Sequence, residues 1–136
     1  MIEFSNIVKR FRRQEVLKGV DITIERGHRI ALVGSNGAGK TTLIRCLLGE
    51  YTCEGTILVD GMEPRKQRRE VLSKVGFVPQ LPPPLRMPVG QLIKFAADLC
   101  GSDPSRMHQV ADELGFDIDR FHSQPFVKLS GGQKQE

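Results

Sequence analysis

One stretch of this 136-residue sequence has the residue types and spacing that bind a chain of phosphates. It is Gly34-Ser35-Asn36-Gly37-Ala38-Gly39-Lys40-Thr41, which fits the pattern GxxxxGK followed by Ser or Thr. Glycines let the backbone turn tightly and aim successive N–H groups at an anion. Lys40 would place a positive charge between the outer phosphates, and the Thr41 hydroxyl would join the ligands of a Mg²⁺ ion. The loop therefore predicts a nucleotide phosphate site.

A second glycine motif, Leu129-Ser130-Gly131-Gly132-Gln133, lies near the end of the sequence. A serine followed by two glycines at an expected helix start offers a hydroxyl and free backbone N–H groups to another anion. Considered alone, the same pentapeptide is equally compatible with an ordinary helix cap. Kinases, GTPases, helicases and transporters share the phosphate loop, so this second motif has to distinguish between them.

The segments around the phosphate loop have the patterns that such a loop requires. Residues 29–33 form a largely apolar run, which predicts a strand buried on both faces of a parallel sheet. After Lys40, apolar residues recur at helical spacing as far as Gly49, a natural C-terminal cap. Upstream, residues 20–24 alternate between apolar and polar, as in a half-buried strand of an antiparallel part of the fold.

Downstream of the loop, the patterns predict short strands and then a group of helices. Residues 56–59 have strand composition and end at an Asp60-Gly61 turn, and residues 75–78 form a second short apolar run. A weaker, polar helix is expected over 65–73. Prolines at 82–84 impose an extended conformation on residues 81–84. Apolar stripes predict helices over 89–100 and 104–114, which form a small helical insert.

Composition excludes several classes of protein. Hydrophobic residues make up 39% and charged residues 26%, as in an ordinary globular domain. There is no Trp and one Tyr, which argues against a base-stacking nucleic-acid platform. The net charge of +4 fits an anionic ligand without selecting one. No apolar run is long enough to span a membrane, and no secretory signal is expected at the start. The 3 cysteines lack metal-site spacing and are expected to be free thiols.

Taken together, the two glycine motifs resemble those of ABC-type ATPases, and the resemblance extends along the whole chain. The segment Val16-Leu17-Lys18-Gly19-Val20 is similar to the approach to the phosphate loop in that family. Phe11 stands where the family has an aromatic residue, more often Tyr, that stacks on adenine. Gln80 matches the glutamine that helps to ligate Mg²⁺ and senses the terminal phosphate.

The resemblance implies a fold and a set of site residues. The fold is α/β, a P-loop NTPase core with an N-terminal antiparallel β part and a small helical subdomain. Within it, residues 1–80 would be the nucleotide-binding core, and residues 81–136 the helical insert ending in the signature motif. The cofactors would be ATP and Mg²⁺, with Thr41 and Gln80 as metal ligands. The expected ATP contacts are Phe11, Val16, Gly34 to Thr42 and Gln80, with Ser130, Gly131, Gly132 and Gln133 reaching the ATP of another subunit.

The resemblance also implies partners and a place in the cell. Two such domains would pair head to tail around two ATP molecules, close on binding and open on hydrolysis. An integral membrane permease subunit would dock on the region after Gln80, which includes Leu81–Val89 and the helical insert. The alternative for the Pro-rich segment is a buried connection. The protein would then be cytoplasmic, on the cytoplasmic face of a membrane, and would couple ATP to transport. The alternative is a soluble ABC-type ATPase that acts on ribosomes or DNA. A third interpretation is a nucleotide-binding module without catalysis.

The family's catalytic Glu and switch His would follow the signature motif, and the sequence ends at Glu136. We therefore expect the 136 residues to be the N-terminal part of one ABC ATPase domain that binds ATP without hydrolysing it, whereas its parent would be an ATP hydrolase. Two acidic sites, Asp60 and Asp112-Glu113, are interpreted as structural and not catalytic. Glu136 also stands where the family usually has Arg. We expect residues 29–33 to keep an exposed apolar edge that promotes aggregation.

Overall fold

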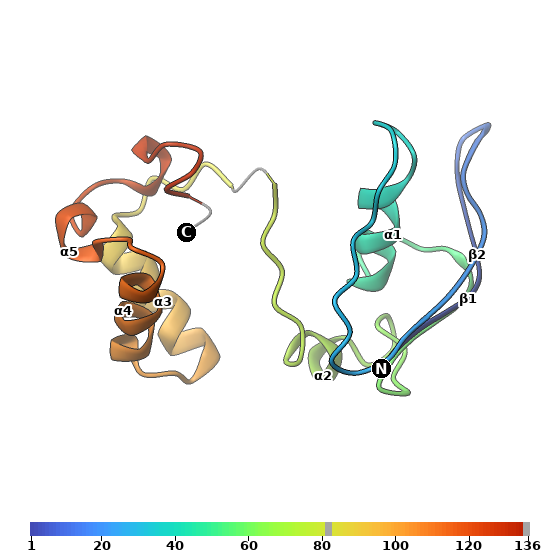
Figure 1. The fold of residues 1–136 in the computed structure, drawn as a ribbon, viewed down its shortest axis with the longest axis horizontal. Helices are drawn as coiled ribbons and strands as arrows, with labels where there is room; N and C mark the ends of the chain where they lie inside the picture. Colours follow the sequence, from blue (N-terminus) through green and yellow to red (C-terminus); the bar gives the residue numbers. More distant parts are fainter. Residues whose placement is uncertain (81–82, 135–136) are drawn as a thin grey trace. The chain divides into compact units, whose positions relative to one another are not determined.

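A long β-hairpin opens the first of two units, residues 1–76 and 77–136, into which the chain divides (Figure 1). The computed structural model describes residues 1–80 and 83–134. Leu81 and Pro82, which begin the predicted extended and docking segment, lie outside the described residues. Gln135 and Glu136, and with them the departure noted at Glu136, also lie outside the described residues.

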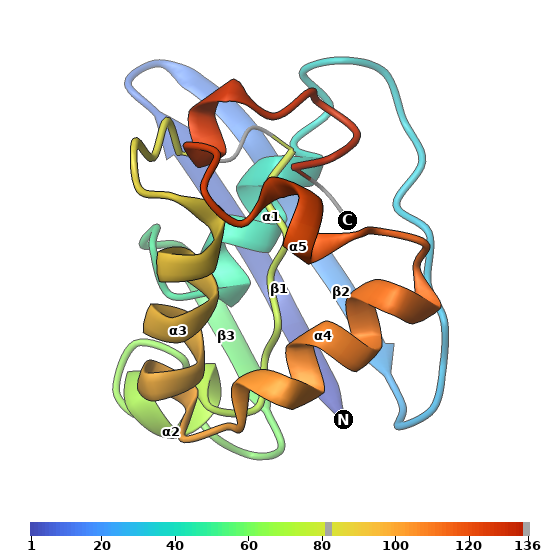
Figure 2. The ribbon, with the colours of Figure 1, turned by 90° about the vertical axis from the view of Figure 1, so that its left-hand side faces the viewer.

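The sheet of the first unit contains three antiparallel strands. β1 (Ile2–Phe11) and β2 (Gln14–Ile24) pair along their length, and β3 (Glu54–Val59) pairs with the other edge of β1. The strand order is therefore β2-β1-β3, as Figure 2 shows. The strands predicted over 20–24 and 56–59 are confirmed as parts of β2 and β3.

β1 itself was not predicted, because a bulge hides its alternation. Ile2 and Phe4 are two residues apart, as the alternation of a strand requires. The pairing register between β1 and β2 then shifts, so the next buried side chain, Ile7, follows three residues after Phe4. Asn6 lies at the shift with a φ of 51°, and its backbone N–H donates to the Asp21 carboxylate at 2.7 Å. The bulge thus breaks the period-two pattern that identifies a strand in a sequence.

The helix that follows the phosphate loop packs on the sheet and closes the core of this unit. α1 (Lys40–Leu47) buries Leu43 and Cys46. These residues join four buried side chains of the strands, namely Phe4, Ile7, Leu17 and Ile57. This core fixes the C-terminal part of α1 against the sheet, so that the first turn of α1 is held at the end of the loop. α2 (Arg68–Leu72), shorter than the helix predicted over 65–73, follows the β3 turn.

The turn after β3 has the geometry predicted for Asp60-Gly61. Both residues have positive φ, 48° and 78°, and the N–H and C=O groups of Val59 and Met62 pair across the turn. Such a two-residue type I′ turn favours Asp followed by Gly. The Asp60 carboxylate accepts hydrogen bonds from the Met1 amine at 2.7 Å and from Arg26. These contacts account for Asp60 structurally, as predicted.

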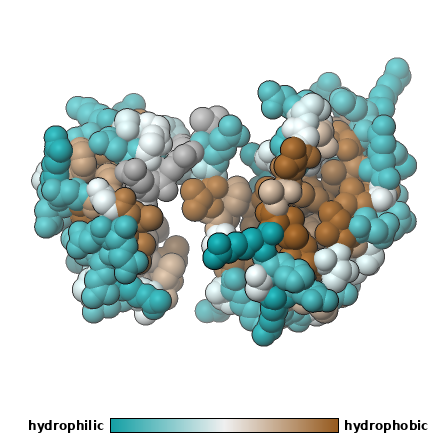
Figure 3. Space-filling view, in the orientation of Figure 1, coloured by the Kyte–Doolittle hydropathy of each residue, from teal (hydrophilic) through white to brown (hydrophobic). Residues whose placement is uncertain are grey.

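The structure differs from the prediction at the two apolar runs, 29–33 and 75–78. Neither forms a strand, because strands need hydrogen-bonded neighbours and no described segment pairs with them. Ile30, Leu32 and Val33 are 56%, 41% and 92% exposed, so the predicted burial of this run on both faces is wrong. Figure 3 shows hydrophobic surface over this part of the first unit.

The second unit is helical and has a core of its own. α3 (Val89–Cys100) and α4 (Pro104–Glu113) confirm the two predicted helices, and α5 (Ile118–Phe121) and the 3₁₀ helix η1 (Phe126–Lys128) were not predicted. Gly101 ends α3 in the left-handed conformation, and Asp103 caps α4 by accepting from the Ser105 N–H at 2.9 Å. None of the helices in the described part of the chain has the length and apolarity needed to cross a bilayer.

Candidate functional site

The phosphate loop has the backbone conformation that its glycines predict. Gly37 and Gly39 both have left-handed φ values, 85° and 92°. At Gly39 a side chain is excluded twice over, because an added Cβ would also lie 2.9 Å from the Leu17 Cδ2 and 3.1 Å from the Val16 Cγ1. Val16 thus supports the base of the loop from β2. A larger residue at position 39 would strain this path through its left-handed φ and would displace the side chains of Leu17 and Val16.

The first turn of α1 presents backbone donors at the end of this loop. Gly39 is the N-cap and has no side chain that could accept their hydrogen bonds. The first turn also contains no acidic residue. The free N–H groups and the positive end of the helix dipole therefore favour an anion here. Ser35, Asn36, Ala38 and Thr41 are exposed, while Thr42 is half-buried.

Lys40 bridges the phosphate loop. Its Nζ donates to the carbonyl oxygens of Gly34 at 2.6 Å and Ser35 at 2.9 Å. An ammonium group has three N–H donors, so one remains for a phosphate oxygen. The loop is also closed on itself, since the Ala38 N–H donates to the Ser35 carbonyl at 3.2 Å. The charge of Lys40 is thus held over the loop by the loop's own backbone.

Phe11 ends β1 with its ring 40% exposed, so it is not a core residue. Its ring meets that of Tyr51 edge to face, with centroids 5.4 Å apart, and the Lys9 ammonium lies 4.9 Å from its centroid. Tyr51 is in turn fixed by Arg45 of α1, whose Nη1 donates to the phenol oxygen at 2.7 Å. An exposed aromatic ring held in this way is suited to stacking on a planar base.

The role of Tyr51 was not predicted, because nothing in its sequence neighbourhood marks it. It lies between α1 and β3 in a connecting segment, and its contact with Phe11 arises only when β1 and α1 pack together. Within the first unit, Phe11 therefore contacts Tyr51, and Val16 lies against Gly39 of the loop. Gln80 belongs to the second unit, where it is exposed just after the run at 75–78.

The signature motif forms a reciprocal cap at the end of the second unit. The Ser130 N–H donates to the Gln133 Oε1 at 3.0 Å, and the Gln133 N–H donates to the Ser130 Oγ at 3.3 Å. The two hydrogen bonds have the pattern of a capping box, but residues 131–134 form a turn and no helix follows within the described residues. The Ser130 hydroxyl keeps its own proton to donate, and Gly131 and Gly132 have open space where a side chain would be.

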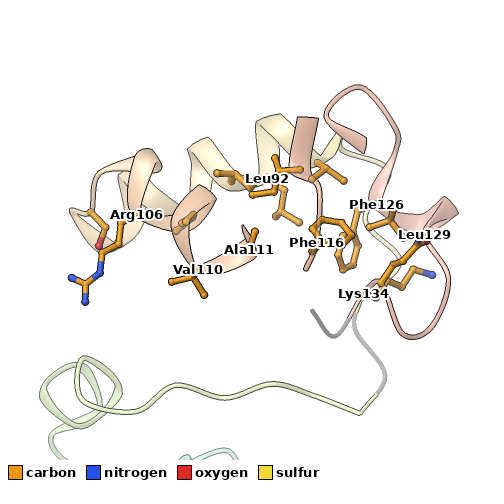
Figure 4. Close-up of a pocket in the computed structure, with 14 residues that line it drawn as sticks. Leu92, Arg106, Val110, Ala111, Phe116, Phe126, Leu129 and Lys134 are labelled. Atoms are coloured by element: carbon orange, nitrogen blue, oxygen red, sulfur yellow. The ribbon is translucent and has the colours of Figure 1, made fainter. Parts of the chain in front are cut away.

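A cavity in the second unit has a different character. It has a volume of about 480 Å³ and lies between α3, α4 and η1 (Figure 4). Its lining is chiefly apolar, with Arg106 and Lys134 among the lining residues. Of the residues predicted to contact ATP, Gln133 alone is part of this lining. An apolar cavity with so few polar groups does not match a triphosphate.

The oxygen ligands near the phosphate loop fit a Mg²⁺ ion that is also bound by phosphate oxygens. They do not form a metal site built from protein side chains alone. Among residues 1–80 and 83–134, no three His, Cys, Asp or Glu side chains converge as metal ligands. The Thr41 hydroxyl lies in the first turn of α1, next to the loop. Mg²⁺ commonly takes one or two protein oxygens and completes its shell with water and phosphate oxygens. The Thr41 hydroxyl beside the phosphate loop is consistent with this mode of Mg²⁺ coordination.

Comparison with known proteins identifies the family of the chain. The family model described as ABC transporter matches residues 17–136. The chain is 33% identical over its whole length to the zinc import ATP-binding protein ZnuC of Rickettsia conorii, of which it covers 54%. It is 37% identical to the lipoprotein-releasing system ATP-binding protein LolD of Porphyromonas gingivalis, with 99% of the chain and 66% of that protein covered. The chain thus spans 54% and 66% of the length of these two relatives.

Solved structures of the family share this fold. The ATP-binding subunit of an ABC transporter superposes with a TM-score of 0.84 at 24% identity, over 98% of this chain and 57% of that one. A bacterial Atm1-family ABC exporter with ATP bound gives a TM-score of 0.82 at 29% identity, over 98% of this chain and 25% of that one. With the family model matching most of its length, the chain belongs to the ABC transporter ATP-binding family.

Proposed function

We propose that the chain binds ATP with Mg²⁺ and is the ATP-binding part of a subunit that couples ATP hydrolysis to transport across a membrane. The observation that carries this proposal is the phosphate loop itself. Two left-handed glycines shape it, Lys40 bridges it, and it ends at the uncapped first turn of α1. Those three features together provide backbone donors, a dipole and a fixed positive charge for a phosphate chain.

Each predicted site residue has a defined part in this proposal. Phe11 stacks on the base, Val16 supports the loop, and Lys40 contacts the outer phosphates. The Thr41 hydroxyl and the Gln80 amide oxygen hold Mg²⁺, which supplies charge neutralisation at the phosphates when it is bound. The remaining contacts come from the backbone of Gly34–Gly39 and from Thr42. Ser130, Gly131, Gly132 and Gln133 act on the nucleotide of a second ABC ATPase domain in a head-to-tail dimer.

Hydrolysis and transport belong, in this proposal, to a longer protein. The proposal places the carboxylate that activates water in a part of the protein that follows residue 136. We propose that residues 1–136 alone bind ATP without turning it over. The names of the relatives, which include zinc import and lipoprotein release, support a membrane permease as the further partner and the cytoplasmic face of a membrane as the location.

Titration of the chain with ATP and Mg²⁺ in a calorimeter tests the nucleotide proposal. Lys40→Ala is expected to weaken binding by about tenfold to a hundredfold, because a charge-assisted hydrogen bond contributes about 1.5–3 kcal/mol. Lys66→Ala is the matched control, since its ammonium lies on the surface beside Glu63. Equal affinities for the two variants would contradict the proposed site. Phosphate release by the unmodified chain would contradict only the proposal that these residues bind ATP without hydrolysing it.

A further inference from the structure

Two of the three cysteines lie near each other in the first unit, at the end of α1 that is farther from the phosphate loop. Cys46 is in the last turn of α1 and is 2% exposed, and Cys53 directly precedes β3. Cys53 packs against the core cluster that contains Cys46. Both residues line one small cavity of about 110 Å³. The third cysteine, Cys100, is exposed and belongs to the second unit.

We propose that Cys46 and Cys53 are a redox-sensitive pair that forms a reversible disulfide when the protein meets a peroxide. The bridge would connect the end of α1 to the start of β3 and close the segment Leu47–Thr52 into a ring. Neither the family match nor the nucleotide proposal requires a thiol at either position. The pair is therefore a modification site in addition to the ATP site.

The two thiols have different parts in the reaction. Burial, followed by the neighbouring Cys53, raises the pKa of Cys46 to about 11, so Cys46 stays protonated at neutral pH. Cys53 is only half-buried and is the thiol that an oxidant reaches first. Its thiolate attacks one peroxide oxygen, and the O–O bond breaks to give a sulfenic acid and, after protonation, water.

The second step closes the bridge. Cys46 loses its proton as its sulfur attacks the sulfur of the Cys53 sulfenic acid, and the hydroxyl group leaves as water. In total, two thiols and one hydrogen peroxide give one disulfide and two water molecules. The two electrons lost by the sulfur atoms are those that reduce the peroxide. A thiol reductant reverses the bridge by exchange.

The position of the pair gives the bridge a local consequence. The ring that it closes contains Tyr51, whose phenol is held by Arg45 and whose ring contacts Phe11. Fixing both ends of this segment restricts Tyr51 and, through it, the exposed ring of Phe11. Any effect on ATP affinity therefore rests on the proposed function, whereas formation of the disulfide does not.

Oxidation of a Cys100→Ser variant of the chain tests the proposal without altering either core thiol. After one equivalent of hydrogen peroxide, we expect both remaining thiols to become unreactive under denaturing conditions, and the mass to fall by two hydrogens. A glutamyl protease, which cuts after Glu50 between the two cysteines, should release two peptides linked through Cys46 and Cys53, and a thiol reductant should separate them and restore both thiols. The emission of Tyr51, the single tyrosine in a chain without tryptophan, should fall because a neighbouring disulfide quenches it.

Two further variants identify the order of attack. In Cys46→Ser with Cys100→Ser, Cys53 should stop at a sulfenic acid that dimedone traps. In Cys53→Ser with Cys100→Ser, the buried Cys46 should remain a free thiol under the same treatment. The proposal is overturned if the Cys100→Ser chain keeps both thiols, gains oxygen atoms at Cys53 while Cys46 stays free, or links only between molecules. An unchanged ATP affinity after the bridge forms would overturn the coupling through Tyr51 alone.

Discussion

Single residues in this chain are explained by the charges and backbone angles around them, and Asp60 shows this most directly. The hydrogen bond from the Met1 amine, and then that from Arg26, lower its pKa from 3.8 to about 2. A carboxyl group with a lowered pKa in the folded state stabilises the fold above its unfolded value, near pH 3.8. That stabilisation is lost as the pH falls toward about 2. Asp60 thus acts on stability, and not on a reaction.

Asp60→Asn should therefore lower the urea midpoint at pH 7, and its difference from the unmodified chain should shrink as the pH falls from about 4 to about 2. Asn also accepts positive φ and keeps the turn, so the charge alone is removed. Urea titrations at several pH values measure this difference. Glu25→Gln, at an exposed site in the same unit, is the control. A difference that stays constant between pH 7 and pH 2 would contradict the role of the Asp60 charge.

Among the elements, those whose period is regular could be predicted from the sequence. α3 and α4 were found because their apolar residues recur at helical spacing and a glycine follows each stripe. The phosphate loop was found because its chemistry fixes glycine and lysine at set positions. β1 was missed because its bulge at Asn6 interrupts the alternation. The run at 29–33 was assigned to a strand because apolar sequence indicates burial without specifying which neighbour supplies the hydrogen bonds.

The bulge gives a prediction for Gly55 at the start of β3. Gly55 has a φ of 86°, and an added Cβ would overlap the carbonyl oxygens of Ser5 and Asn6. Those atoms belong to the backbone of β1, so they can make room for a Cβ only if the strand itself moves. Gly55→Ala should therefore cost at least about 2 kcal/mol of unfolding free energy. Urea unfolding, followed through Tyr51 emission, measures that cost.

Gly61→Ala is the matched control for this substitution. Gly61 has a similar φ of 78°, but nothing lies within 4 Å of an added Cβ. It should lose only the cost of the left-handed conformation, about 1–2 kcal/mol. If the two variants were equally stable, the close approach of β1 to Gly55 would contribute nothing to the unfolding free energy. The comparison separates a backbone-angle effect from a packing effect between strands.

At the scale of the whole molecule, exposed apolar surface determines how the chain behaves in solution. In the first unit, Ile30, Leu32 and Val33 are exposed side by side in sequence. In the second unit, Phe95 and Leu99 of α3 are 56% and 76% exposed. Contiguous apolar surface of this kind favours association, because contact between two copies removes it from water. We therefore expect the chain to associate increasingly as its concentration rises.

Replacing Ile30 by Lys tests which surface is responsible. Ile30 is 56% exposed and lies outside the phosphate loop, so a charge there should leave the fold intact. Light scattering coupled to gel filtration should then show a lower average mass than for the unmodified chain at the same concentration. Thr23→Lys, an exposed site on β2 of the same unit, adds the same charge and should leave the mass unchanged. If both variants shifted the mass equally, net charge and not the apolar run at 29–33 would control association.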